Sequence, residues 1–153
     1  MKKTIITAIA VVFTAISFAN PLPDINERVL KNFKATFKAA EEVKWSEHES
    51  HYSVSFLLSS VQTRVNYDKE GNIISSSRSY APSLLPLNIY NAVTNRYTGK
   101  TLFGVTEVAD DKTVLYVIKM YDDKKWYTLH ADAEGNTEIA EKYERADIGL
   151  LKK

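Results

Sequence analysis

The sequence predicts an α+β fold in which two tandem repeats, each a helix followed by four strands, share one antiparallel sheet and pack their helices on one face. An internal repeat with an offset of 64 positions carries this prediction. It relates an alternating strand pattern, a turn with Asp and Gly, and a helical apolar stripe in the first half to the same patterns in the second half. The matched segments are 52–56 with 116–120, 68–72 with 132–136, and positions 25, 29 and 33 with 89, 93 and 97. Patterns that recur in step indicate a duplicated unit.

The first 19 residues have the order of an export signal. Lys2 and Lys3 precede an apolar run at 5–16, and Ser17-Phe18-Ala19 forms a small-x-small cleavage site. We expect cleavage after Ala19, which would place the mature chain in the periplasm or outside the cell. The run is short for a membrane helix, which needs about 20 apolar residues, although an uncleaved anchor is the alternative.

Removal of residues 1–19 takes away two Lys and leaves 18 basic and 19 acidic residues, a net charge of −1. This balance does not favour nucleic acid or a membrane surface as a partner. The chain has no Cys, so neither a lipid anchor on Cys nor a disulfide framework is expected. The remaining 134 of 153 residues suit one domain at 20–143 with a shared core, followed by a C-terminal tail at 144–153.

The first repeat covers about 24–80. Asp24 with Glu27 three residues later predicts the start of a helix. Its apolar stripe should cover a sheet, because Lys residues occupy the opposite face. Four strands follow at 42–46, 51–58, 61–67 and 72–80, with an Asp-x-x-Gly reversal at 68–71 before the last. The stripe comprises Ile25, Val29, Phe33 and Phe37, with Leu30 and Ala40 beside them.

The second repeat covers about 84–143. Pro82 and Pro86 mark the crossing, and a helix at 87–98 should end at Gly99. Strands are predicted at 101–108, 113–121, 125–131 and 136–143.

Five segments together resemble the secreted beta-lactamase-inhibitor-like, PepSY-like family. They are the helix with Val29 and Phe33, Val43-Lys44-Trp45, Tyr52-x-Val54-x-Phe56, Tyr67-Asp68-x-x-Gly71 and Leu85-Pro86. The resemblance covers roughly residues 26–143. It implies helices on one face of an antiparallel sheet built from two repeats. Proteins of this shape include an inhibitor of beta-lactamase, and PepSY domains are proposed to restrain peptidases, but this chain lacks the Cys residues of the inhibitor.

No residue set commits the chain to a reaction, a cofactor or a metal. Ser75, Ser76 and Ser77 lie along a predicted strand without the elbow of a nucleophile, which favours a polar strand face. His48 and His51 lack a third metal ligand. The Asp and Glu pairs at 68–70 and 132–134 are explained by hairpin turns, since calcium normally takes six or more oxygen ligands. We therefore predict no catalytic, cofactor-binding or metal site.

The sheet face away from the helices is the candidate site. Strand alternation directs Trp126, Thr128 and His130 outward, where the first repeat has Gln62, Arg64 and Asn66. Leu115, Val117 and Tyr121 share this parity on the preceding strand and extend an apolar patch. Trp45 is assigned to the core. Two interpretations of the patch stay open: a contact surface for a partner, or a surface covered by the terminal tail.

These patterns favour an exported, non-enzymatic binding module. It would capture a protein or peptide of the cell envelope or the surrounding medium through the open sheet face, with inhibition of a hydrolase or peptidase as one role. The alternative is a periplasmic small-molecule carrier that binds its ligand between sheet and helices.

Overall fold

The computed structural model describes residues 24–146, which form two helices and one eight-stranded antiparallel sheet. The strands follow one another in the sheet in chain order. The predicted signal peptide at 1–19 lies outside the described residues, as does most of the tail. The elements are α1 (Glu27–Thr36), β1 (Glu41–Glu47), β2 (His51–Leu58), β3 (Val61–Asp68), β4 (Ile73–Tyr80), the 3-10 helix η1 (Pro82–Leu84), α2 (Leu87–Arg96), β5 (Thr101–Ala109), β6 (Val114–Tyr121), β7 (Lys125–Asp132) and β8 (Thr137–Glu144).

Helix α1 begins two residues later than the sequence predicts. Its N-cap is Asn26, whose side-chain Oδ1 accepts a hydrogen bond from the backbone N–H of Arg28 at 2.8 Å. Asp24 lies outside the helix and does not cap it. Either residue type can cap a helix, but only Asn26 stands where its side chain reaches a free N–H of the first turn. The apolar stripe of the helix is as predicted, with Val29 and Phe33 buried.

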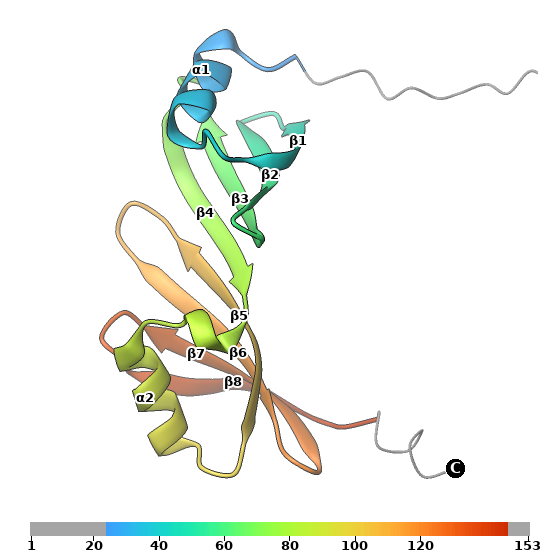
Figure 1. Cartoon of the computed structure of the whole chain (residues 1–153), viewed down its shortest axis with the longest axis vertical. Coiled ribbons are helices and arrows are strands. Elements are labelled where there is room, and N and C mark those ends of the chain that lie inside the picture. The colour runs from blue at the N-terminus through green and yellow to red at the C-terminus, as the bar shows by residue number, and fades with distance from the viewer. Residues whose placement is uncertain (1–23, 147–153) are drawn as a thin grey trace, which may run out of the picture.

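The apolar side chains form two clusters, so the predicted single shared core is wrong. One cluster lies beneath α1 and the other beneath α2, and no residue of β4, the strand between them, is buried. Figure 1 shows α1 and α2 near opposite ends of the long axis of the molecule. Trp45 packs against the first cluster, as predicted. The first cluster comprises Val29, Phe33, Tyr52, Val54, Phe56, Val65 and Tyr67; the second comprises Leu85, Ile89, Val93, Val105, Tyr116, Ile118, Met120, Tyr127, Leu129 and Ala131.

Both helices cover the same face of the sheet. Directly opposed residues on antiparallel strands point to the same face. Phe56 of the first cluster lies opposite Thr63, Thr63 opposite Arg78, and Arg78 opposite Glu107. Glu107 in turn lies opposite Tyr116 of the second cluster. This unbroken row leaves the other face, here called the open face, without a covering helix.

The two halves of the sheet meet at a short seam. Strands β4 and β5 pair only over Ser76–Tyr80 and Val105–Ala109. On the helix side of the seam Arg78 forms an ion pair with Glu107, with Nη2 2.7 Å from Oε1. Tyr80 donates to the same carboxylate at 2.7 Å. Burial and this bond to Glu107 raise the pKa of Tyr80. The halves are therefore joined by backbone pairing, by the polar contacts of Glu107 and by the ring of Tyr80, which packs against the second cluster.

The turn after β3 is held against α1 by a glycine. Gly71 has φ of +93°, as the turn prediction requires, and its carbonyl accepts a hydrogen bond from the side-chain amide of Asn32 at 2.9 Å. Asp68 closes the turn by accepting from the backbone N–H of Asn72 at 2.7 Å. Gly135, in the turn after β7, has φ of +90°.

We expect Gly71→Ala to cost more stability than Gly99→Ala. Both glycines have positive φ, which costs a residue with a Cβ roughly 1 kcal/mol or more. A Cβ on Gly71 would lie 3.2 Å from Nδ2 of Asn32, whereas nothing lies within 4 Å of a Cβ on Gly99. Loss of the Asn32 bond should therefore add about 1 kcal/mol at Gly71 alone. Urea unfolding of the two variants measures the difference, and equal losses would contradict the packing argument.

Candidate functional site

The open face of β7 is arranged as the alternation predicts. Tyr127, Leu129 and Ala131 are buried in the second cluster, so Trp126 and His130 point to the open face. The register places Tyr121 directly opposite Trp126, and Val117 directly opposite His130. Leu115, another predicted site residue, lies opposite Val108 of β5, which is exposed. The structure thus brings five of the six predicted residues onto one surface.

Thr128 does not form part of the accessible surface, although it was predicted as a contact. Only 4% of it is exposed. Its hydroxyl donates to Oε2 of Glu141 at 2.8 Å and accepts a hydrogen bond from Nζ of Lys119. Lys119 and Glu141 also pair with each other at 3.6 Å. These two long side chains cover the short Thr128 and separate it from solvent.

An aromatic cluster of Phe103, Tyr121 and Trp126 lies at the outer end of the open face. The ring centroids of Phe103 and Trp126 are 5.1 Å apart in an edge-to-face arrangement, and those of Tyr121 and Trp126 are 4.9 Å apart. Phe103 is 66% exposed. Tyr143 of β8, also exposed, lies opposite Trp126 and extends the cluster. Packed aromatic rings of this kind, with exposed Phe103 and Tyr143 at the edges, give the sheet a rigid apolar surface.

Arg145 covers part of this cluster from the end of β8. Its guanidinium lies 4.4 Å from the ring centroid of Tyr121 and 5.6 Å from that of Trp126. Its backbone N–H donates to the carbonyl of Lys124 at 2.9 Å. Arg145 belongs to the predicted tail, and its guanidinium contacts the cluster. The interpretation of a surface covered by the whole tail concerns residues outside the described part.

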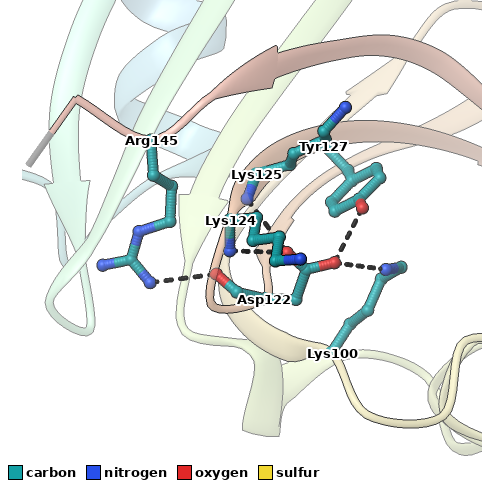
Figure 2. A network of polar contacts seen from close by, with 6 residues as sticks. All are labelled: Lys100, Asp122, Lys124, Lys125, Tyr127 and Arg145. Carbon is teal, nitrogen blue, oxygen red and sulfur yellow. Dashed lines mark hydrogen bonds and ion pairs between the residues drawn. The ribbon is translucent and has the colours of Figure 1, made fainter. Parts of the chain in front are cut away.

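Asp122 fixes the hairpin that positions the aromatic cluster (Figure 2). Its Oδ2 accepts from Nζ of Lys100 at 2.8 Å and from the hydroxyl of Tyr127 at 2.7 Å. Its Oδ1 accepts from the backbone N–H groups of Lys124 and Lys125, each at 2.9 Å. The bonds from Lys100 and Tyr127 are the main reason that the pKa of Asp122 lies well below its ordinary value. A carboxylate with four donors holds the turn between Tyr121 and Trp126 in one shape.

The other half of the open face is polar. A hollow of about 180 Å³ lies between β2, β3 and β4. Nε of Arg64 donates to the hydroxyl of Ser55 there at 3.1 Å. The predicted polar strand face of β4 supplies Ser77 and Ser79. The hollow is lined by Ser55, Gln62, Thr63, Arg64, Ser77 and Ser79.

A larger hollow of about 330 Å³ opens on the helix side, beside η1. Arg78, Tyr80 and Leu84 form part of its wall. The carrier hypothesis expected a ligand groove between helix and sheet, but core side chains fill the space beneath α1 and α2. The hollow lies instead next to the seam.

The two histidines that the sequence offers as metal ligands lie side by side. His48 and His51 stack in the turn between β1 and β2 with centroids 4.4 Å apart. Within residues 24–146 no group of three or more potential metal ligands comes together. No helix of that same part of the chain is long and apolar enough to cross a membrane.

Sequence reasoning missed Phe103. Alternation from buried Val105 places residue 103 on the helix side, but the register shifts between Leu102 and Gly104. The extra residue of this bulge lets Phe103 reach Trp126 on the open face. Gly104 was the available signal, because Gly within a strand often marks a bulge.

Several solved structures share this fold. A BLIP-like protein from Bacteroides fragilis matches with a TM-score of 0.60 and 14% identity, over 78% of this chain and 85% of the other. A DUF2874 family protein from Bacteroides uniformis matches with a TM-score of 0.59 and 22% identity, over 78% and 88%. A candidate periplasmic protein from Bacteroides eggerthii matches with 0.59 and 16%, over 80% and 90%. The predicted beta-lactamase-inhibitor-like fold is thereby confirmed.

No protein-family model matches the chain, and neither does a curated protein sequence.

Proposed function

We propose that the protein is an exported, non-enzymatic binding module that captures a protein or peptide through its open face. The aromatic cluster of exposed Phe103 with partly buried Tyr121 and Trp126 is the observation that carries this proposal. Its rings are carried by paired strands and pack against one another, so binding should freeze few torsions. Large aromatic side chains of this kind dominate the energetics of interfaces.

Four observations support export and a role without catalysis. The N-terminal sequence has the order of a signal peptide, and one structure with the same fold is a candidate periplasmic protein. Another is BLIP-like, which favours inhibition of a hydrolase or peptidase as the consequence of capture. The titratable groups of the site serve turns and ion pairs, as the Asp122 network illustrates (Figure 2). We also propose that the chain is PepSY-like, as the resemblance of its sequence implies.

The tandem repeat is also part of the proposal. Each helix precedes four strands, and the turns after β3 and β7 have the same closure. Asp68 accepts from Asn72, and Asp132 accepts from Asn136, through both the backbone N–H and the side-chain amide. Divergence after duplication would leave one polar half and one apolar half of the open face.

Trp126→Ala is expected to weaken partner binding by about 2 kcal/mol, which is roughly 30-fold. The mature protein serves as bait in envelope extracts, and calorimetry with the recovered partner measures the dissociation constant. Tyr90→Ala is the matched control, because Tyr90 is an exposed aromatic residue on α2, away from the open face. Equal affinity of the Trp126 variant and the wild type would show that the cluster is not the contact surface.

The second candidate is a small-molecule carrier, favoured by the 330 Å³ hollow beside η1. This volume is at the lower end of the range for drug-sized ligands, about 300–1,000 Å³. A saturable small ligand whose binding is lost in Leu84→Arg, while no macromolecule is recovered by the bait, would select the carrier.

A further inference from the structure

The polar half of the open face contains an arginine with no acidic partner. Within residues 24–146 Arg64 forms no ion pair, and its one hydrogen bond runs from Nε to Ser55. Arg78 and Lys119 differ in this respect. Arg78 pairs with Glu107 on the neighbouring strand β5, and Lys119 pairs with Glu141 on β8. The two terminal nitrogens of Arg64 thus keep their donors for a ligand, in the fork that suits a carboxylate.

The surroundings of Arg64 favour an anion. None of the six residues that line its hollow is acidic, and three of them are serines whose hydroxyl groups can donate. Lys44 of β1 lies opposite Ser55, which lies opposite Arg64, so a second cation occupies the same row of the open face. From β1 to β4 this row therefore offers positive charge and hydroxyl donors and contains no carboxylate. An open-face carboxylate of β1, Glu41, lies opposite Leu57 in the next row.

The size of the hollow limits its occupant to a single chemical group of a ligand. Its volume of about 180 Å³ is below the roughly 300–1,000 Å³ typical of sites for whole small molecules. One carboxylate side chain fits this space.

The distance between Arg64 and the aromatic cluster indicates that a ligand in contact with both is a macromolecule. Arg64 is on β3 and Trp126 is on β7, four strand spacings away. At about 4.8 Å per spacing, the two sites are roughly 19 Å apart across the strands. The row of Arg64 meets β7 at Asp132, six residues from Trp126, which adds roughly 20 Å along the strands at about 3.4 Å per residue. The two components together give a separation of roughly 28 Å. A ligand that engages both must present an acidic and an apolar group at this separation, as a polypeptide does.

We propose that the Arg64 hollow binds an Asp or Glu side chain of the protein partner whose apolar side chains cover the aromatic cluster. This inference rests on the proposed function, because it specifies the partner of the same face. It adds that binding depends on charge complementarity in the polar half, and that raised salt weakens it.

A random 12-residue peptide library displayed on phage tests the proposal with the mature protein as target. Such a peptide spans up to roughly 40 Å when extended, enough to reach both sites. We expect enrichment of sequences that combine an Asp or Glu with an aromatic or large aliphatic residue. Replacing the acid by its amide should weaken binding about tenfold to the wild type and leave binding to Arg64→Gln unchanged, as expected for a directly paired charge.

Lys142→Gln is the matched control, because it removes the same charge from the helix side, where Lys142 lies opposite buried Tyr127. It should keep the tenfold effect of the acid. Peptides that need Trp126 but show no coupling between their acid and Arg64 would overturn the subsite and leave the proposed function standing. A library that yields no binder dependent on Trp126 would count against both.

Discussion

Phe56→Ala is expected to lower the free energy of unfolding by about 3–5 kcal/mol, because it removes a fully buried ring and leaves a cavity. Phe56 is 0% exposed on β2. Its ring centroid lies 5.2 Å from that of Phe33 and 4.9 Å from that of Phe37. These contacts attach the sheet to α1 and to the residue that follows it. Urea unfolding followed by circular dichroism measures the loss.

Phe103→Ala is the matched control for this substitution. It deletes the same side chain at a position that is 66% exposed. Its cost should stay below about 1 kcal/mol, since little area is removed from water there on folding. Similar losses for the two variants would show that Phe56 does not lie in a packed core.

Leu129→Ala is expected to cost about 2–5 kcal/mol in the second cluster. Leu129 is 0% exposed and belongs to the same cluster as Ile89 and Val93 of α2. Thermal unfolding monitored by calorimetry is a suitable measurement, with a drop in Tm of several degrees or more.

Trp126→Ala, three residues earlier on the same strand, provides the comparison. Trp126 points to the open face, so its removal should disturb Phe103 and Tyr121 without opening a cavity beneath α2. We expect a loss well below that of Leu129→Ala. A larger loss for Trp126→Ala would mean that the aromatic cluster stabilises the fold more than it serves a partner.

The strands were predictable because their alternation is strong. In β2 and β6 every second residue is buried, and the predicted bounds agree with the observed ones to within one residue. The predicted start of α1 was wrong because Asp24 and Asn26 are both suitable caps, and the sequence does not show which one meets a free N–H.

The division into two clusters was not predicted, because alternation identifies buried positions but not the cluster that each one joins. The signal was present in β4, where Ser75, Ser76 and Ser77 offer little apolar area. A strand without buried side chains cannot continue a core across the sheet.

At the candidate site, strand alternation was sufficient to place five residues on the open face: Leu115, Val117, Tyr121, Trp126 and His130. It failed where geometry departed from simple alternation or where long side chains covered short ones. Phe103 reached the open face through a bulge, and Thr128 was covered by Lys119 and Glu141. Neither effect follows from residue spacing alone.

The seam between β4 and β5 is a joint between two separately packed halves. Each half has its own apolar cluster. The joint contains the backbone pairing over Ser76–Tyr80 and the Arg78–Glu107 ion pair. A change of twist at this joint alters the gap between the Arg64 hollow and the aromatic cluster while both cores stay packed. This strand pair is one of the four that separate Arg64 from Trp126, so substitutions at Arg78 or Glu107 would change that distance without altering either proposed contact site.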